Sequence, residues 1–278
     1  MTSPSLLLLI PAYNEERRIE PVLRAYASYF ERQYQGKFEL LVVMNGCRDN
    51  TLGVVQRVAK EFPSIKWLEF KDPIGKGGAL IEGLRAETAA ELIGYVDADG
   101  ATPPHAFLDL INRIGGYDCV IGSRWLPGAV LHQEQSGKRQ FASRVFHFIV
   151  QMLFWMNIRD TQCGAKVIRR AAVEKIHSSL RIADMAFDIN LLYSLKRAGY
   201  RILEVPTEWT DQIGSKVVLG STSLTMLLSA IRIRLIYWPW LYQLLRPLKP
   251  LEIWIYKKLR QPTPLSGPDS VQGPKSKV

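Results

Sequence analysis

The first 122 residues alternate short apolar runs with segments of helical periodicity, and this alternation restricts the fold more than any other feature of the chain. Short apolar runs bounded by turn residues predict strands, while apolar residues spaced three and four positions apart predict amphipathic helices. The expected strands are 5–10, 38–43, 65–70, 92–96 and 118–121, and the expected helices between them are 15–31, 50–61, 78–89 and 104–114. Strand and helix repeated in this order predict an α/β protein with a mostly parallel sheet covered on both faces.

The pattern changes after Arg124, where polar loops separate longer helical segments. We expect loops at 126–138 and 159–164, helices at 140–157, 170–178 and 187–198, a strand at 201–205, and amphipathic helices between 224 and 260 that prolines interrupt. Asn14 and Asp49 are placed to cap the first two helices of the chain. From Gln261 onward, proline, serine and glycine dominate without an apolar period, which is typical of a disordered tail.

The excess of positive charge is concentrated near the end of the chain. Lysine and arginine number 36 against 26 aspartate and glutamate residues, which gives +10, and residues 213–278 hold ten basic side chains against two acidic ones. A protein that grips nucleic acid more often spreads its basic residues over the main fold, so we expect no nucleic-acid partner. Basic residues mixed with Leu, Ile, Trp and Tyr favour contact with a membrane surface.

No segment of the sequence fits a signal peptide or a membrane span. The run 6–10 lacks a preceding basic region and leads straight into a proline, so it is expected to be a buried strand. Residues 145–158 are apolar but fall short of the ~20 residues needed to cross a bilayer. Residues 224–245 are long enough, but Arg232 and Arg234 interrupt them, which favours a helix lying on the membrane.

Asp97-Ala98-Asp99 is the sharpest chemical signal in the sequence. The pair follows the apolar run 92–96, which should deliver both carboxylates to the carboxyl edge of the sheet, where ligands of such sheets bind. Two carboxylates this close repel each other unless a cation lies beside them. Oxygen ligands on a turn suit Mg²⁺ or Mn²⁺, with a diphosphate completing the coordination. The alternative is that both aspartates serve as turn and cap residues before Pro103.

Gly75-Lys76-Gly77-Gly78 lies between the third expected strand and the third expected helix. Glycines allow backbone amides to approach an anionic ligand, and a lysine beside a helix amino end favours negative charge. The alternative is an ordinary turn. The spacing is not that of a P-loop, and the chain has neither the Gly-x-Ser-x-Gly of serine hydrolases nor a Cys-x-x-Cys pair for structural zinc.

Four further polar clusters are expected at strand ends or in loops: Pro11–Glu15, Gly122–Arg124, Arg159–Gly164 and Gly214–Lys216. The first two follow expected strands, so an aromatic ring, a carboxylate and a cation should share a sheet edge with Asp97. Each cluster also has a structural alternative. These are that Tyr13 packs, that Arg124 forms a salt bridge, that Asp160 caps a helix, and that Lys216 is a solvated charge.

Taken in order, these segments resemble family-two glycosyltransferases of the polyprenyl-phosphate sugar synthase group, and most closely the dolichyl-phosphate β-glucosyltransferases. The resemblance runs from residue 5 to about residue 237 and rests on Ile10–Glu15, Gly75–Gly78, Asp97–Thr102, Gly122–Arg124, Asp160–Gly164, Phe187-Asp188 and Gly214–Lys216. It implies the nucleotide-diphospho-sugar transferase (GT-A, Rossmann-like) fold, an inverting transfer and a divalent cation. We therefore expect a catalytic domain over 1–222, with a nucleotide-sugar half at about 1–124 and an acceptor half at about 125–222, followed by membrane-surface helices at 223–260 and the disordered tail at 261–278.

The resemblance also implies a role for each matching residue. The turn that contacts the nucleoside is matched by Pro11, Tyr13 and Glu15, and the loop beside the nucleotide by Lys76 and Gly77. The pair that holds the metal and the diphosphate is matched by Asp97 and Asp99. Residues near the donor sugar or its phosphate are matched by Arg124, Asp160 and Gln162. The cationic side that meets the acceptor phosphate is matched by Arg139, followed by Ser143, and by Ser215 and Lys216.

Two positions depart from the family pattern. The usual Asp-Asp-Gly-Ser after the second strand reads Met44-Asn45-Gly46-Cys47 here, and the amide of Asn45 both donates and accepts, which leaves the preference for the donor base open. The mannosyl branch has a glutamine where this chain has Ala101, which favours the glucosyl branch. The transmembrane helices of many relatives are absent, so we expect membrane attachment through this chain's own surface or through a partner.

We therefore expect inverting transfer of a hexose, glucose from UDP-glucose, to a polyprenyl or dolichyl phosphate. The acceptor phosphate is already anionic and needs no strong base, so the chemical task is to stabilise the departing nucleotide diphosphate while Arg139 and Lys216 offset the acceptor charge. The alternatives are the same reaction with GDP-mannose, a transferase with a soluble acceptor such as phosphoglycerate, and a non-catalytic nucleotide-sugar binding module.

The lipid acceptor accounts for the composition of the second half. The apolar segment 145–158 and six aromatic residues are expected at the headgroup boundary, the six being Tyr237, Trp238, Trp240, Tyr242, Trp254 and Tyr256. The protein should then be cytoplasmic and peripheral on the inner face of the membrane. The alternative is that these aromatics pack on the core or on a second copy of the chain.

Overall fold

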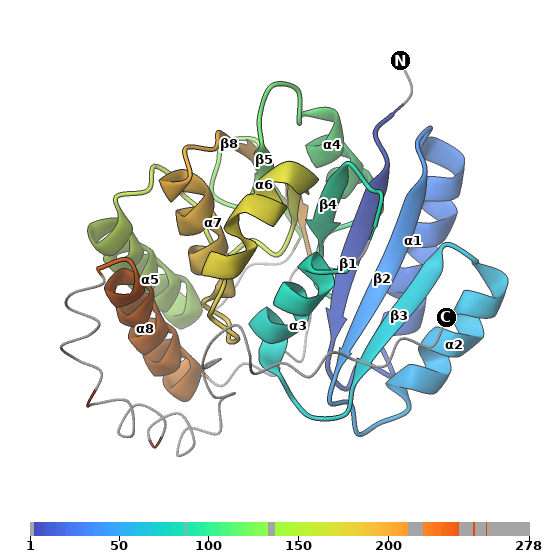
Figure 1. Cartoon of the computed structure of the whole chain (residues 1–278), viewed down its shortest axis with the longest axis horizontal. Coiled ribbons are helices and arrows are strands. Elements are labelled where there is room, and N and C mark those ends of the chain that lie inside the picture. The colour runs from blue at the N-terminus through green and yellow to red at the C-terminus, as the bar shows by residue number, and fades with distance from the viewer. Residues whose placement is uncertain are drawn as a thin grey trace.

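The computed structural model describes residues 3–86, 88–132, 137–210 and 219–238, together with Pro247 and Trp254, and leaves the side chains of 137–143 and 219–224 outside that description. Within these residues the chain forms a seven-stranded sheet in the order β3-β2-β1-β4-β7-β5-β8 (Figure 1). Its strands are β1 (Leu6–Ala12), β2 (Phe38–Asn45), β3 (Ile65–Phe70), β4 (Leu92–Tyr95), β5 (Cys119–Ser123), β7 (Lys166–Arg169) and β8 (Ile202–Pro206). A second, two-stranded parallel sheet joins β6 (Val130–Leu131) to β9 (Glu208–Trp209).

Helices cover both faces of the large sheet. They are α1 (Ile19–Gln33), α2 (Thr51–Glu61), α3 (Gly75–Leu84), α4 (Pro104–Asn112), α5 (Gly137–Phe154), α6 (Arg170–Ile176), α7 (Phe187–Arg197) and α8 (Leu219–Ile236), with a short 3₁₀ turn at His177–Ser179. Residues of α1, α2 and α4 pack on one face, and residues of α3, α6 and α7 pack on the other. The mostly parallel, two-sided α/β architecture expected from the sequence is therefore confirmed.

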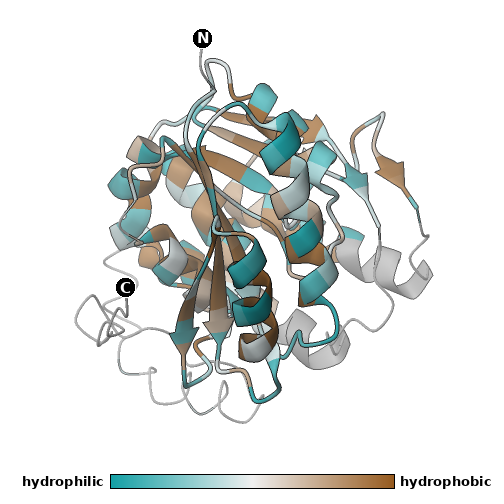
Figure 2. Ribbon diagram, turned by 90° about the vertical axis from the view of Figure 1, so that its right-hand side faces the viewer, coloured by the Kyte–Doolittle hydropathy of each residue, from teal (hydrophilic) through white to brown (hydrophobic). Residues whose placement is uncertain are grey.

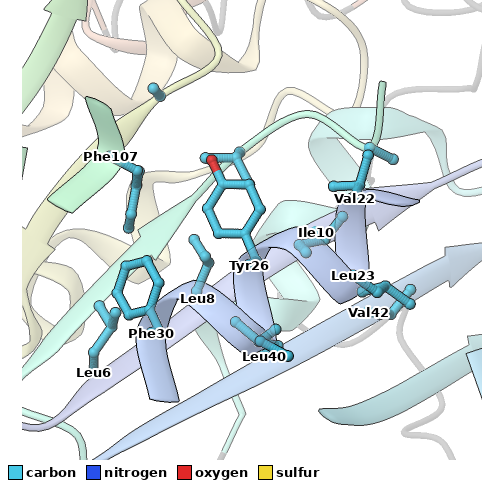
Figure 3. Packing of buried hydrophobic residues seen from close by; sticks show 14 of the residues in the cluster. Leu6, Leu8, Ile10, Val22, Leu23, Tyr26, Phe30, Leu40, Val42 and Phe107 are labelled. Carbon is cyan, nitrogen blue, oxygen red and sulfur yellow. The ribbon is translucent and has the colours of Figure 1, made fainter. Parts of the chain in front are cut away.

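The side chains of β1 alternate between the two faces, and both faces are buried. Leu6, Leu8 and Ile10 join the cluster with α1, α2 and α4, whereas Leu7 and Leu9 join the cluster with α3, α6 and α7. Figure 3 shows the first of these clusters, where side chains of α1 lie over β1 and β2. Full burial of such a side chain stabilises the fold by about 1.5–3 kcal/mol. An uninterrupted apolar run is therefore what a central strand of a two-sided sheet requires.

The predicted caps of the first two helices have different outcomes. α1 begins at Ile19, later than expected, because Asn14 has a left-handed backbone with φ 54° and lies in the turn before the helix. Its Oδ1 accepts a hydrogen bond from the backbone N–H of Arg48 at 2.7 Å, so the predicted cap at Asn14 is wrong. Asp49 Oδ1 does accept from the first amide of α2 at 3.1 Å, as the sequence predicts.

β7 is a strand that the sequence pattern does not predict. It lies antiparallel between β4 and β5, with Lys166 opposite both Tyr95 and Ile121. Its four residues include a lysine and an arginine and lead directly into α6, so the segment reads locally as the start of a helix. Because β7 is antiparallel, its first residue lies where β4 and β5 end. The polar loop 159–165 therefore arrives at the same sheet edge as the two aspartates.

α8 crosses the domain boundary expected at residue 222. Ala230 and Ile233 of this helix are buried in the same cluster as α7, and α8 lies side by side with α5 (Figure 1). Tyr237, expected at the membrane, instead packs on this core and shares a hydrogen bond of 2.6 Å with Ser194 Oγ. The beginning of the expected membrane segment is thus packed against α5 and α7, because Ala230 and Ile233 of α8 are buried in this core.

Hydropathy follows the layers of the fold. In Figure 2 the strands of the large sheet are mostly hydrophobic, while the surface helices carry hydrophilic residues on their outer sides. Among the described residues, no helix combines the length and the apolar character that a membrane crossing demands.

Candidate active site

The end of β4 carries two aspartates to the carboxyl edge of the sheet. All four residues of β4 are buried, and Val96 continues the pairing by donating a backbone hydrogen bond to Leu9 O at 3.1 Å. Asp97 and Asp99 follow and are partly exposed, with buried Ala98 between them. The structure thus places both carboxylates where parallel sheets bind their ligands.

The carboxylate of Asp97 is held between a lysine and a glycine. Lys76 Nζ lies 2.5 Å from Asp97 Oδ1, and both side chains are mostly buried. On the other side, Asp97 Oδ2 lies against the backbone of Gly164, where any side chain would collide with the carboxylate. Gly164 is therefore the residue that allows the loop before β7 to approach Asp97 so closely.

Asp99 has fewer partners and is electrostatically strained. Its Oδ1 accepts from the Ala101 backbone N–H at 3.0 Å. Burial raises the pKa of Asp99, and the charge of Asp97 raises the pKa further, while Lys76 and Arg18 only partly oppose this. A carboxylate in this position is stabilised by an added cation.

The donor atoms at this edge fit a hard divalent cation. Asp97 and Asp99 offer carboxylate oxygens, and the part of the chain that the structure describes has no group of three His, Cys, Asp or Glu side chains that could enclose a metal ion. Mg²⁺ and Mn²⁺ are commonly bound by one or two carboxylates, with waters and substrate phosphates completing the coordination. The residues present therefore match such an ion shared with a diphosphate.

Lys76 is positioned by the turn that opens α3. Asn45, at the end of β2, accepts through its Oδ1 from the backbone N–H groups of Ile74 at 2.6 Å and Gly75 at 3.0 Å. Burial lowers the pKa of Lys76, but the nearby aspartates led by Asp97 outweigh this and raise the pKa, so the side chain stays a cation. The structure thus gives Asn45 a role in shaping the lysine turn, while its predicted contact with the donor base stays a prediction.

The glycines of this turn serve helix packing. A side chain at Gly77 would collide with the carbonyl of Ile182, and the Gly78 backbone N–H donates to Ala183 O at 3.1 Å. The amide of Gly78 is therefore already used within the protein rather than left for an anionic ligand. The predicted helix start at 78 is also too late, since α3 begins at Gly75, whose φ of 78° suits glycine.

The first strand leads into the turn expected to contact the nucleoside. Pro11 lies near the end of β1, Tyr13 is exposed, and the Glu15 backbone N–H donates to Thr51 Oγ1 at 2.9 Å. The Glu15 carboxylate binds the guanidinium of Arg18 through two hydrogen bonds of 2.7 Å. Glu15 therefore orients Arg18.

Arg18 is a cation that the sequence analysis did not single out. Its pKa is raised first by the hydrogen bond to Glu15 and also by the charge of Asp99, although burial opposes both. It thus adds positive charge near the carboxylate pair. The sequence feature that could have indicated this cation is its position three residues after Glu15, in the same turn.

Arg124 and Asp160 form a buried bidentate ion pair. Arg124 Nε lies 2.7 Å from Asp160 Oδ2, Nη2 lies 2.9 Å from Oδ1, and the Arg124 backbone N–H also donates to Oδ2 at 3.0 Å. Burial raises the pKa of Asp160, but the Arg124 guanidinium outweighs it and holds the pKa below its usual value. The guanidinium also lies 5.0 Å from the ring centre of Trp209. The salt-bridge alternative for Arg124 is therefore the observed one, and the helix-cap alternative for Asp160 is wrong.

The loop around Asp160 is anchored from β8. Glu204 accepts from the backbone N–H groups of Arg159 at 2.9 Å and Asp160 at 2.7 Å. Gln162, two residues on, has a buried Nε2 with no hydrogen-bond partner in the described structure. An unpaired buried amide is costly, so this side chain is suited to a ligand that supplies an acceptor.

The structure does not bring every expected site residue together. Lys76, Asp97 and Asp99 lie together at one edge of the sheet. Arg124 binds Asp160, and the charge of Asp97 also raises the pKa of Arg124. Arg139 lies in the first turn of α5, and its side chain is outside the described atoms. Ser215 and Lys216 lie outside the described residues altogether.

The mostly parallel seven-stranded sheet, the family match and the likeness to solved structures together show a glycosyltransferase of the GT-A class. The chain belongs to glycosyl transferase family 2, whose family model matches residues 8–177. It is 32% identical over 247 residues to a dolichyl-phosphate β-glucosyltransferase of Dictyostelium discoideum, covering 84% of this chain and 74% of that protein. The human dolichyl-phosphate β-glucosyltransferase is 31% identical over 252 residues, covering 84% and 75%.

Glycosyltransferase AglD of Haloferax volcanii is 33% identical over 215 residues, and the match covers 76% of this chain but only 34% of AglD. Among solved structures, mannosyl-3-phosphoglycerate synthase from Rubrobacter xylanophilus superposes with a TM-score of 0.64 at 19% identity, covering 84% of this chain and 74% of that one. Glucosyl-3-phosphoglycerate synthase from Mycobacterium tuberculosis, in complex with Mn²⁺ and UDP-glucose, superposes with a TM-score of 0.57 at 18% identity, covering 82% and 79%. At these identities the structural likeness shows the shared GT-A fold.

Proposed function

We propose that this protein transfers glucose from UDP-glucose to dolichyl or another polyprenyl phosphate, with inversion at the anomeric carbon. The observation that carries the proposal is the pairing of Lys76 with Asp97 beside Asp99 at the carboxyl edge of the sheet. Two dolichyl-phosphate β-glucosyltransferases that match more than four fifths of the chain support the same reaction. An α-linked donor attacked in line gives a β-linked product.

In this proposal, Asp97 and Asp99 would hold a divalent cation, Mg²⁺ or Mn²⁺, which would supply charge neutralisation for the departing nucleotide diphosphate. Lys76 adds a fixed positive charge on the same side, and Arg18 adds a second. These groups are already oriented in the protein, so little reorganisation is needed as the leaving group gains charge.

The acceptor side requires a different arrangement. The phosphate of a polyprenyl phosphate is ionised at neutral pH and attacks without a strong base. Arg139 and Lys216 would offset its negative charge as it approaches the donor. Asp160 is held by Arg124 and Glu204, so this carboxylate would orient the donor sugar with Gln162 rather than accept a proton.

The exposed face of α5 supports membrane contact. Val145, Phe148 and Met152 are exposed by 42%, 64% and 62%, and their spacing of three and four residues places them on one side of the helix; Trp155, just after the helix ends at Phe154, is exposed by 81%. A row of large apolar side chains in water is unfavourable and marks an interaction surface. We propose that this row, named here the α5 apolar stripe, enters the headgroup boundary of a lipid bilayer.

The end of the stripe has features of an interfacial anchor. Trp155 has a left-handed backbone with φ 51°, a strained conformation for a bulky residue. Its backbone carbonyl accepts a hydrogen bond from Lys196 Nζ, so a cation lies at the end of the stripe. On α8, Arg234 lies 5.6 Å from the ring of exposed Trp238. Aromatic rings beside basic residues suit an anionic lipid surface, which favours a peripheral protein on the cytoplasmic face.

The proposed reaction is tested by incubating the purified protein with UDP-glucose labelled in the sugar, dolichyl phosphate in liposomes, and Mg²⁺ or Mn²⁺. We expect label in the organic phase, loss of transfer with EDTA, and a β linkage by NMR. Parallel arms with GDP-mannose and with 3-phosphoglycerate test the other donor and a soluble acceptor. UDP-glucose binding without transfer to either acceptor would identify a binding module and overturn the proposal.

A further inference from the structure

A buried ion pair lies directly behind the carboxylate edge and has no role in the reaction described so far. Lys166, the first residue of β7, is fully buried, and its Nζ lies 2.5 Å from Asp188 Oδ1. Tyr95, the last residue of β4, donates its hydroxyl hydrogen to the same oxygen at 2.5 Å. Asp188 belongs to the Phe187-Asp188 segment, to which the family resemblance assigns no role.

Such a pair needs an explanation beyond core stability. Two charges lose their hydration on burial, and well-packed apolar side chains of similar size often stabilise a protein equally well. The contacts of Lys166 indicate what the pair does. Besides Asp188, its Nζ binds the carbonyl of Cys163 at 2.6 Å, and the next residue is Gly164, whose backbone lies against Asp97 Oδ2.

A second connection runs through Lys76. The positive charge of Lys76 interacts with Asp188 as well as with Asp97. The charges thus alternate in the order Asp97, Lys76, Asp188 and Lys166. Each charge in the row is flanked by the opposite sign, so the Asp97 carboxylate is fixed by Lys76 on one oxygen and by the Lys166-anchored backbone on the other.

We propose that Lys166 and Asp188 are positioning residues that fix the Asp97 carboxylate for the nucleotide diphosphate and its divalent cation. Lys166 acts through the Cys163–Gly164 backbone, and Asp188 acts through the charge of Lys76. Neither touches the donor. The inference rests on the proposed function, because it assigns the nucleotide diphosphate to the edge formed by Asp97 and Asp99.

Two variants separate positioning from stability. Asp188→Asn keeps the shape and removes the charge, and the double variant Lys166→Met with Asp188→Asn removes both charges and leaves neither unpaired. Tyr95→Phe is the matched control, since it removes a hydrogen bond to Asp188 and keeps both charges. Binding of UDP in the presence of Mn²⁺ is measured by calorimetry on the full chain, with circular dichroism and Tm as measures of folding.

We expect both charge variants to fold and to bind UDP with Mn²⁺ roughly 10–100-fold more weakly, while Tyr95→Phe stays close to the wild type. Asp188→Glu, which restores the charge, should recover part of the affinity. Folded charge variants with wild-type affinity would overturn the inference. Failure of the double variant to fold would also overturn it, because the pair would then serve the core. A wild-type protein that binds no UDP would instead contradict the proposed function.

Discussion

Lys76 Nζ lies 2.5 Å from Asp97 Oδ1, so the first turn of α3 and the end of β4 are joined by an ion pair at the carboxyl edge of the sheet. The negative charges of Asp188 and Asp99 also raise the pKa of this lysine. One side chain therefore offsets several carboxylates. In the proposed function, this lysine would face the negative charge of a nucleotide diphosphate bound beside Asp97.

Replacing Lys76 by methionine should weaken donor binding more than it affects the chemical step. The variant removes a cation that faces the diphosphate already in the bound donor, so most of its loss appears in KM, and the smaller part gained as the leaving group acquires charge appears in kcat. We expect the KM for UDP-glucose to rise by roughly tenfold, a cost of about 1.4 kcal/mol. Lys71→Met is the matched control, because Lys71 is exposed and belongs to the same connection. A kcat change with unaltered KM would contradict this assignment.

Replacing Asp99 by asparagine should abolish transfer and stabilise the protein in the absence of divalent cations. The pKa of Asp99 is raised by burial and by Asp97, so the folded state holds its proton to higher pH than the unfolded state. Stability therefore falls as pH rises through that window, and the cost persists above it. At pH 7 in EDTA, Asp99→Asn should show a higher Tm than the wild type, with turnover reduced by at least ~10²-fold.

The pH dependence supplies the control for this variant. At about pH 3 and below, roughly one unit under the usual pKa of aspartate, Asp99 is mostly protonated in both states and the Tm difference should become small. Added Mn²⁺ should raise the Tm of the wild type, because a ligand of the folded state stabilises it, and should have little effect on Asp99→Asn. An equal Mn²⁺ response in both proteins would place the cation elsewhere.

Arg124→Ala should destabilise the fold strongly. The variant leaves Asp160, which is only 2% exposed, as a buried charge without its bidentate partner. Removing one member of such a pair lowers the free energy of unfolding by about 3–5 kcal/mol. Urea denaturation measures this, with Arg170→Ala as the control, since the exposed Arg170–Glu174 pair should contribute less than about 0.5 kcal/mol.

A second substitution separates the charge from the loss of packing. Adding Asp160→Asn to Arg124→Ala removes the unpaired charge, so part of the stability should return. If the double variant is no more stable than Arg124→Ala alone, then packing of the guanidinium on Trp209, rather than its charge, dominates the contribution of Arg124.

The sequence predicts those parts of the fold that depend on local pattern. β1 and β4 are recognisable because each is an apolar run that the sheet buries on both faces, and the position of Asp97 follows from the end of β4. β7 is not recognisable, because its pairing depends on β4 and β5, which lie far away in the chain. Because the loop before β7 is placed by this pairing, the sequence also does not predict that Arg124 pairs with Asp160, 36 positions away, or that Gly164 contacts Asp97.

The last prediction concerns the α5 apolar stripe and its contact with lipid. Phe148→Ser with Met152→Ser should weaken binding to vesicles containing anionic lipid by roughly tenfold or more, since full burial of each side chain is worth about 1.5–3 kcal/mol. Transfer to dolichyl phosphate in liposomes should fall in parallel, while UDP binding stays unchanged. Trp67→Ser is the control, because Trp67 is an exposed aromatic on β3, the edge strand that lies on the other side of the molecule from α5 (Figure 1). Unaltered vesicle binding together with loss of a dimer on gel filtration would show that the stripe faces a second copy of the chain.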